Sequence, residues 1–304
     1  MAKWTAADMP SQRGRTFVVT GTGGLGYEDA LALAKADAEV ILAGRNTGAG
    51  QAAVERIKAE ARGARISFAH LDLSDLASVR RFCGRLASER DALDGLINNA
   101  GVMNPPVRME TVDGFELQFG TNYLGHFVLT AGLLPLLRRG TRSRVVTLSS
   151  IAARQGDIHF DDLHFGEDYL PMKAYAQSKI ACLMFALELQ RRSDAGGWGI
   201  TSIAAHPGVS RTNLLLNTPG GSGAAGVARK LLGFLFQPVW QGALPTLFAA
   251  TAPEAKAGGY YGPDRLGETR GYPAEARIPA PAREPETLRL LWTESGRLTN
   301  TSFP

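Results

Sequence analysis

The chain has 304 residues, of which 44% are hydrophobic and 20% charged, the composition of an ordinary globular protein. Its formal charge of +4 is not gathered into basic clusters with interleaved aromatic residues, which argues against nucleic-acid binding. The sequence has no run of about 18 apolar residues and no signal-peptide core at its start, so we expect a cytoplasmic protein without a membrane anchor. Cys83 and Cys182 lie in apolar helical patterns without metal-ligand spacing, which predicts two buried free thiols.

Strand-like and helix-like patterns alternate along residues 16–206. In chain order we expect strands at 17–20, 39–43, 65–69, 93–97, 144–148 and 200–204. Helices are expected at 27–35, at 49–61, from an N-cap at Ser74 to Ser88, at 121–138 and around Tyr175. This alternation predicts an α/β fold, namely a single doubly wound Rossmann-type domain with helices on both faces of a predominantly parallel sheet of about seven strands.

The pattern weakens after Gly208. Here we expect a mobile loop at 217–226, helices at 230–236 and 243–250, a last strand at 258–262 and an extended surface segment at 263–285. We interpret residues 1–304 as one domain, with a core at 14–265, a substrate lid at 209–236 and a C-terminal extension at 266–304.

A glycine-rich turn follows the first expected strand and opens the first expected helix. Gly21, Gly23 and Gly26 fit the pattern G-x-G-x-x-G in this context. Such a turn binds phosphate through free backbone N–H groups at the positive end of the helix. The alternative is a tight turn that needs positive φ angles and binds nothing.

The end of the second expected strand distinguishes between the two nicotinamide dinucleotides. An NAD site has an acidic residue there to bind the ribose 2′-hydroxyl, but this chain has Ala43-Gly44-Arg45-Asn46. An arginine in place of the acid favours a 2′-phosphate and therefore NADP(H). The alternative is that Arg45 is an ordinary surface residue.

Tyr175 and Lys179 are four residues apart in a helical pattern and therefore share one helix face. A free phenol titrates near ~10, too high for proton transfer at neutral pH, and a nearby ammonium group favours the phenolate. A proton-transfer pair in the same chain as a nucleotide-binding turn indicates hydride transfer.

These features occur in order with four others, which are Asn98-Asn99-Ala100-Gly101, Asn122, Ser149-Ser150 and Pro207-Gly208. The ordered set resembles the short-chain dehydrogenase/reductase family over roughly residues 14–265. In one respect the chain departs from the family pattern T-G-x-x-x-G-x-G, because only two residues separate Gly21 from Gly24.

Within the family the chain is most similar to the retinol-dehydrogenase-like branch. That similarity is carried by His159-Phe-Asp-Asp-Leu163, Ala205-His-Pro-Gly208, Glu268-Thr-Arg-Gly271 and Leu290-Leu-Trp-Thr293. The separation of 25 residues between Ser150 and Tyr175, longer than in most of the family, also fits this branch.

The resemblance implies a role for each matching residue. Tyr175 would be the general acid or base, Lys179 would favour its phenolate and hold the nicotinamide ribose, Ser150 would bind the substrate carbonyl, and Asn122 would hold a relay water. The cofactor contacts would come from Gly21, Gly23, Gly24, Leu25, Gly26, Arg45, Asp72, Leu73, Asn99, Ala100, Gly101, Tyr175, Lys179, Pro207, Gly208 and Thr212.

Several of these residues have structural alternatives. Ser149 and Ser150 can simply end a strand, and Asn122 can simply bond to the backbone. We interpret His206 as a structural imidazole before the Pro207 turn. His159 and His164 with Asp161 and Asp162 have no regular metal-ligand spacing, so we expect no metal site.

The predicted activity is NADP(H)-dependent interconversion of a ketone or aldehyde and an alcohol. Apolar residues at 214–216 and 231–236 favour a hydrophobic or bulky small-molecule substrate. The alternatives are reduction of a C=C or C=N bond, and a catalytically silent NADP-binding regulatory protein. The resemblance also implies a homodimer or homotetramer.

Overall fold

The computed structural model describes residues 3–210 and 237–304. Within them the chain forms one α/β domain around an eight-stranded sheet of order β3-β2-β1-β4-β5-β6-β7-β8. Strands β1 to β7 pair in parallel, and β8 pairs antiparallel to β7. The strands are β1 (Thr16–Thr20), β2 (Glu39–Gly44), β3 (Arg65–His70), β4 (Gly95–Asn98), β5 (Arg144–Leu148), β6 (Thr201–Ala205), β7 (Tyr260–Arg265) and β8 (Arg270–Glu275). The predicted doubly wound fold is confirmed.

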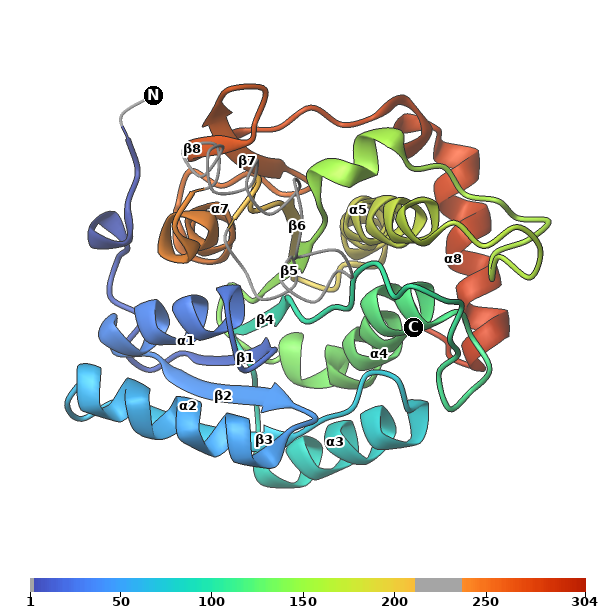
Figure 1. Ribbon diagram of the computed structural model, residues 1–304. Helices are drawn as coiled ribbons and strands as arrows, with labels where there is room; N and C mark the ends of the chain where they lie inside the picture. The colour runs from blue at the N-terminus through green and yellow to red at the C-terminus, as the bar shows by residue number, and fades with distance from the viewer. Residues whose placement is uncertain (1–2, 211–236) are drawn as a thin grey trace.

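Helices cover both faces of this sheet. They are α1 (Leu25–Lys35), α2 (Thr47–Glu60), α3 (Leu76–Glu89), α4 (Gly125–Leu137), α5 (Pro171–Gly196), α7 (Val239–Thr251) and α8 (Pro285–Thr299). Short helical segments are η1 (Ala6–Asp8), η2 (Phe119–Leu124), η3 (Ile151–Gln155) and η6 (Ala280–Arg283). Helices α1, α2 and α7 lie on one face, α3, α4 and α5 lie on the other, and α8 packs outside α5 (Figure 1).

Burial on both faces explains the apolar strand sequences. In β1, Phe17, Val18 and Val19 are all fully buried. Val18 belongs to the core under α3, α4 and α5, whereas Phe17 and Val19 belong to the core under α1, α2 and α7. Successive side chains point to opposite faces of a strand, so a sheet covered on both sides requires a continuous apolar run.

The strand order reverses between β1 and β4. The chain leaves β1 toward α1 on one face of the sheet, whereas the connection from β4 leads to α4 on the other. In open α/β sheets such a reversal leaves a crevice at the carboxyl ends of the strands. The glycine-rich turn after β1 and the Asn99 segment after β4 both lie at this crevice.

Two expectations about element ends need correction. Ser74 is not the N-cap of α3, because the side chain of Asp75 accepts hydrogen bonds from the N–H groups of Ala77 and Ser78, at 2.9 and 3.1 Å. The hydroxyl of Ser74 instead donates to Asp72 at 2.6 Å. The helix expected at 121–138 begins as the π-helical segment η2 before it continues as α4.

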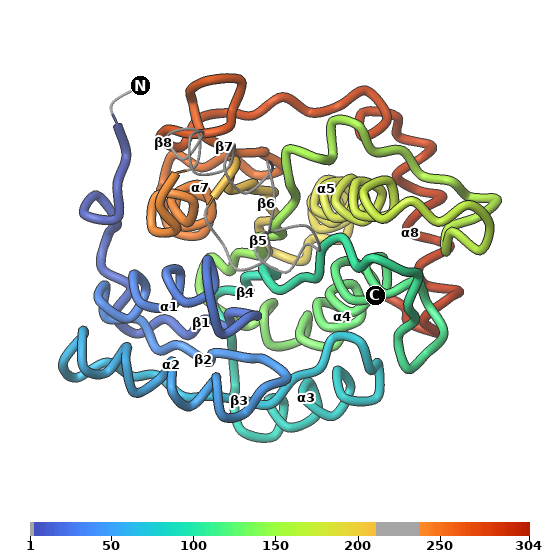
Figure 2. Tube along the Cα trace, in the orientation of Figure 1, coloured from blue at the N-terminus to red at the C-terminus, as the bar shows by residue number. Residues whose placement is uncertain are grey.

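The C-terminal region is more regular than expected. The prediction of an extended segment at 263–285 was wrong, because β7 extends to Arg265 and this region also contains β8 and η6. Proline at 273 hides the strand pattern of β8, but proline is tolerated on an edge strand such as this one. From β8 the chain crosses to α8, which lies on the other side of α5 and packs against it (Figure 2). The lid expected at 209–236 lies outside the described residues from residue 211 onward.

Candidate active site

A cavity of about 540 Å³ opens at the carboxyl ends of the strands. It brings together most of the residues predicted from the sequence: Gly21, Gly23, Gly24, Leu25, Arg45, Asp72, Leu73, Asn99, Ala100, Gly101, Ser150, Tyr175, Lys179, Pro207 and Gly208. Gly26 and Asn122 are not among the lining residues and lie behind the wall. Thr212 lies outside the described residues.

The glycine-rich turn leaves the N-terminus of α1 without a capping side chain. Gly21 and Gly24 have φ angles of 95° and 54°, which favour glycine. Gly24 is the N-cap of α1, and no side chain among the described residues bonds to the first N–H groups of this helix. A Cβ atom at Gly26 would lie 2.2 Å from the carbonyl oxygen of Gly21, so the turn packs against the helix too closely for any other residue. Uncapped N–H groups at a cavity wall fit a pyrophosphate.

The end of β2 forms a polar corner of the cavity. Arg45 is exposed there, and it makes no ion pair with any residue in the described ranges. Thr22 and Asn46 line the same corner. A Cβ atom at Gly44 would lie 2.8 Å from Cγ2 of Thr22, so the glycine turn reaches the residue just before Arg45.

Helix α5 presents Tyr175 and Lys179 to the cavity. The helix begins with Pro171 at its first position, where a missing N–H costs nothing. Nζ of Lys179 lies 6.0 Å from the centroid of the Tyr175 ring and donates to the carbonyl oxygen of Leu148 at 3.0 Å. Both residues are buried, at 6% and 5% exposure, so the pair forms part of the cavity wall and is shielded from bulk water.

The two serines after β5 play different structural parts. The hydroxyl of Ser149 donates to the backbone carbonyl of Lys179 at 2.7 Å and ties β5 to α5. Ser150 is half-buried and caps η3, because its hydroxyl accepts from the N–H of Ala152 at 3.2 Å. That hydroxyl can still donate a hydrogen bond into the cavity. Both serines line the cavity, and the choice of Ser150 as the residue that binds a substrate stays a prediction.

Asn122 lies in the π-helical segment η2 and is 1% exposed. Its side chain accepts from the N–H of Val102 at 2.7 Å and donates to the carbonyl of Val102 and the hydroxyl of Ser178. These bonds clamp the loop after β4 to α5. The proposed relay water at Asn122 stays a prediction.

His126 connects Asn122 to the glycine-rich turn. Burial lowers the pKa of His126 to about 4, so its ring is neutral. Nδ1 donates to the carbonyl oxygen of Asn122 at 2.8 Å, which leaves Nε2 to accept from the hydroxyl of Thr20 at 2.9 Å. The oxygen of that hydroxyl also accepts from the N–H groups of Asn99 and Ala100. Buried hydrogen bonds thus fix both sides of the crevice.

Sequence reasoning missed part of the cavity wall. The additional residues include Thr22, Asn46, Val102, Met103, Ile151 and Met172. Thr22 and Asn46 are next to predicted site residues in the sequence, and this position could have identified them as part of the cavity wall. Met172 is 46% exposed and precedes Tyr175 by about one helical turn, but nothing in the sequence sets it apart from a core methionine.

The remaining candidates have structural partners. Cys83 and Cys182 are buried and free, as predicted, and burial raises the pKa of Cys83 to about 12. Nδ1 of His164 accepts from the N–H of Glu116. Within residues 3–210 and 237–304, no group of three His, Cys, Asp or Glu side chains is arranged to hold a metal ion.

Fold and site together define a dinucleotide-binding α/β protein whose cavity combines an uncapped helix N-terminus with a tyrosine–lysine pair. A family model for short chain dehydrogenases matches residues 15–219, and the chain belongs to that family. It is 43% identical over 298 residues to a mouse polyprenol dehydrogenase, covering 96% of this chain and 85% of the relative. It is 39% identical over 298 residues to human retinol dehydrogenase 13, covering 96% and 86%.

A crystal structure of an uncharacterized protein from Mycobacterium paratuberculosis has a TM-score of 0.83 and 39% identity, covering all of both chains. These similarities place the chain in the retinol-dehydrogenase-like branch, as the sequence motifs predicted. Among the helices that the structure describes, none is both long enough and apolar enough to cross a bilayer.

Proposed function

We propose that this protein is an NADP(H)-dependent oxidoreductase that interconverts a ketone or aldehyde and an alcohol, with Tyr175 as the acid or base. The observation that carries the proposal is the shared cavity. Tyr175 and Lys179, one turn apart on α5, line the same space as the uncapped N-terminus of α1. One wall can hold a dinucleotide while the other can move a proton.

The residues present fit a nicotinamide dinucleotide. Gly21 to Leu25 would hold the pyrophosphate, and Asp72, Leu73 and the segment 99–101 would hold the adenosine side. A Cβ atom at Gly101 would lie 2.9 Å from Oδ1 of Asn122 and 3.6 Å from Nζ of Lys179, so this glycine leaves no room for a larger residue beside the lysine. When bound, the dinucleotide supplies or accepts the hydride.

Ser150, Tyr175 and Lys179 would together orient the substrate oxygen and transfer its proton. The hydroxyl of Ser150 would donate to the carbonyl oxygen and orient it. The hydroxyl of Tyr175 would give that oxygen its proton in reduction, and the phenolate would take the proton back in oxidation. The ammonium of Lys179, at the same wall, would favour the phenolate by Coulomb attraction. Because both side chains are buried, that attraction would be stronger than between two solvent-exposed groups.

Arg45 supports a preference for NADP(H). Arg45, Thr22 and Asn46 all line the cavity, and their side chains together offer donors that suit a phosphate group. A charge-assisted hydrogen bond to phosphate contributes about 1.5–3 kcal/mol, which is about 10- to 150-fold in affinity. Removing Arg45 should therefore weaken NADPH far more than NADH.

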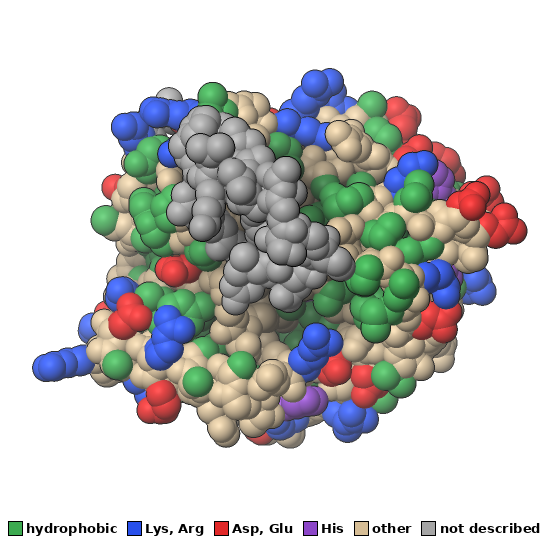
Figure 3. Space-filling view, in the orientation of Figure 1, with side chains coloured by type: hydrophobic (Ala, Val, Ile, Leu, Met, Phe, Trp, Pro, Cys, Tyr) green, Lys and Arg blue, Asp and Glu red, His purple; other side chains and the backbone are tan. Residues whose placement is uncertain are grey.

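The wall near Tyr175 favours a hydrophobic substrate. Val102, Met103, Ile151 and Met172 line it with apolar surface. Hydrophobic side chains also gather on the face of the molecule that Figure 3 shows. The relatives named above act, by their names, on a polyprenol and on retinol, both lipid alcohols. We therefore infer a lipid-like or other bulky apolar carbonyl or alcohol.

The first test measures initial rates with NADPH and NADH over a panel of ketones, aldehydes and one enone, with products identified. Tyr175→Phe should lower kcat about 10²- to 10⁴-fold while NADPH affinity stays within about twofold. Tyr272→Phe, on the edge strand β8 and not among the residues that line the cavity, is the matched control and should behave as wild type. Wild type that binds NADPH but turns over nothing would favour the silent-protein alternative, and a saturated ketone from the enone would favour C=C reduction.

The second test concerns the dinucleotide. Arg45→Gln should reduce kcat/KM for NADPH at least about tenfold and leave NADH nearly unchanged. Arg62→Gln, an exposed arginine just beyond α2, is the control for loss of surface charge. Wild type with a clear preference for NADH would contradict the assignment of Arg45.

A further inference from the structure

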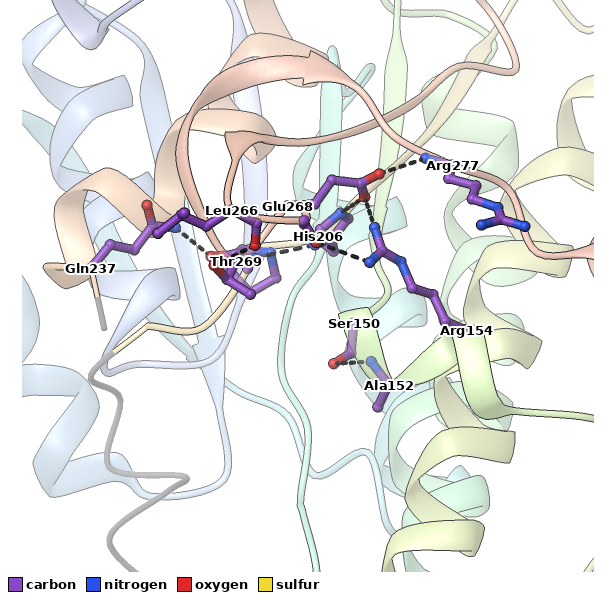
Figure 4. Close-up of polar contacts among 12 residues, drawn as sticks. Ser150, Ala152, Arg154, His206, Gln237, Leu266, Glu268, Thr269 and Arg277 are labelled. Carbon is purple, nitrogen blue, oxygen red and sulfur yellow. Dashed lines mark hydrogen bonds and ion pairs between the residues drawn. The ribbon is translucent and has the colours of Figure 1, made fainter. Parts of the chain in front are cut away.

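A partly buried carboxylate, 20% exposed, joins three loops around the candidate site. Oε2 of Glu268, in the turn between β7 and β8, accepts from Nε2 of His206 at 2.9 Å and forms an ion pair with Nη2 of Arg154 at 2.6 Å (Figure 4). Its other oxygen, Oε1, accepts from the N–H of Arg277 at 3.1 Å. His206 follows β6 and Arg154 lies in η3, so the three side chains come from distant parts of the sequence.

The first branch of this network ends at the Pro207-Gly208 turn. Nδ1 of His206 accepts from the N–H of Gly208 at 3.2 Å, so the proton of the neutral ring is on Nε2 and points to Glu268. The ring is 1% exposed. Burial lowers the pKa of His206, although Glu268 opposes the shift. The ring therefore stays neutral and keeps this tautomer. The His206 side chain can therefore transmit the position of Glu268 to the Gly208 backbone.

The backbone of the β7–β8 turn contacts the same segment. The carbonyl oxygen of Thr269 accepts from the N–H of Val209 at 2.8 Å. Gly208 has a φ angle of 63°, and a Cβ atom there would lie 2.4 Å from that carbonyl oxygen. The turn thus lies directly against residues 208–209, which line the cavity.

The second branch ends at Ser150. Arg154 also donates through Nη1 to the carbonyl oxygen of Gly267 at 2.9 Å, so its guanidinium is held by two groups of the turn. Arg154 lies in η3, whose N-cap is Ser150. A helix of only five residues has little stability of its own, so an anchored side chain near its end helps to set where its first residue lies.

The turn itself has an unfavourable backbone. Leu266, Gly267 and Glu268 have consecutive φ angles of 48°, 64° and 68°, in the left-handed region that disfavours residues with a Cβ atom. Such a conformation persists only where its surroundings hold it. The ion pair to Arg154 and the bond to His206 are those surroundings, so the side chain of Glu268 stabilises the loop that carries it.

We propose that Glu268 is a positioning residue, which sets the Pro207–Val209 wall of the cavity through His206 and the Ser150 segment through Arg154. The kinetic part of this proposal rests on the proposed function, whereas the structural part does not. Glu268 itself is not among the residues that line the cavity. Its effect on the reaction is therefore exerted through the two loops.

The test compares Glu268→Ala and Glu268→Gln with Glu275→Ala. Glu275 lies on β8 of the same hairpin and forms an exposed ion pair with Lys256, so it controls for loss of a surface carboxylate. Hydrogen exchange of peptides covering residues 205–210 should be about tenfold faster in Glu268→Ala, intermediate in Glu268→Gln and unchanged in Glu275→Ala. This readout needs no turnover and so is independent of the proposed activity.

Kinetics at 25 °C separate the two branches. Glu268→Ala should lower kcat about tenfold and weaken NADPH binding several-fold, because it releases both loops. Arg154→Gln should lower kcat more than it weakens NADPH binding, because it releases the Ser150 segment while the bond from His206 to Glu268 remains. If Glu268→Ala does not fold, the same exchange and kinetic measurements on Glu268→Gln and Arg154→Gln test the proposal. Exchange rates, kcat and NADPH affinity all within twofold of wild type in these variants would overturn the proposal.

Discussion

Replacing Gly26 by alanine tests the close packing of the glycine-rich turn. The new Cβ atom would lie 2.2 Å from the carbonyl oxygen of Gly21 and 2.6 Å from Nδ2 of Asn99. Neither group can move freely. The N–H of Gly21 donates to the carbonyl of Ala43 at 2.7 Å, and Nδ2 of Asn99 donates to the carbonyl of Thr20 at 2.7 Å. The turn must therefore shift away from α1 as a unit.

The size of the effect follows from three contributions. Overpacking of this kind costs about 1–3 kcal/mol, and weakening the Asn99–Thr20 hydrogen bond costs about 1 kcal/mol. The higher helix propensity of alanine offsets about 1 kcal/mol. The net loss in the free energy of unfolding is about 2 kcal/mol, which lowers the Tm of a chain of 304 residues by about 3 °C.

The control is Gly23→Ala, since a Cβ atom at Gly23 would meet no atom of the described residues within 4 Å and its φ angle is not positive. Thermal unfolding of both variants without ligand should show a loss for Gly26→Ala and a change within about 0.5 kcal/mol for Gly23→Ala. Titration calorimetry should then show that Gly26→Ala binds NADP⁺ more than about tenfold more weakly, because the N–H groups at the start of α1 are displaced. Equal stability of the two variants would refute this account of the turn.

Two further predictions concern stability. Asp29 is fully buried on α1 with neither carboxylate oxygen bonded to a described residue, and burial, assisted by Glu28, raises its pKa well above the usual value. The folded state then keeps a proton on Asp29 that the unfolded state releases above about pH 4, so the stability of the wild type falls as pH rises. The asparagine of the variant does not titrate, so the difference in Tm between Asp29→Asn and the wild type should grow in favour of the variant from about pH 5 to about pH 8. A difference independent of pH would contradict this. Phe303→Ala should lower the free energy of unfolding in urea by about 2 kcal/mol, because the ring centroid of Phe303 lies 4.5 Å from that of Trp292 and 5.1 Å from that of Phe127. The control, Leu290→Ala, changes an exposed residue and should cost at most about 0.5 kcal/mol. Equal losses in the two variants would show that the packing of these three rings contributes little to stability.

Local sequence determined the regular part of the fold. Strands such as Thr16–Thr20 and Arg144–Leu148 are short apolar runs, and the glycine turn opens a helix, so their order along the chain already implies a doubly wound sheet. Because parallel strands end at one edge, residues that follow them must meet there. That rule was enough to bring Arg45, Asn99, Ser150 and Pro207 to one cavity.

The sequence alone did not reveal how those residues are held. The pairing of β8 with β7 depends on a partner strand that supplies its hydrogen bonds, and this is a non-local condition that the proline-rich sequence of β8 does not show. The bonds of Asn122 to Val102, and of Glu268 to His206 and Arg154, join residues at least 20 positions apart. Local patterns report which element a residue prefers, because propensity and periodicity act over a few residues. Which buried polar groups become partners is decided only when distant elements pack, since each desolvated group must then find a hydrogen bond within reach.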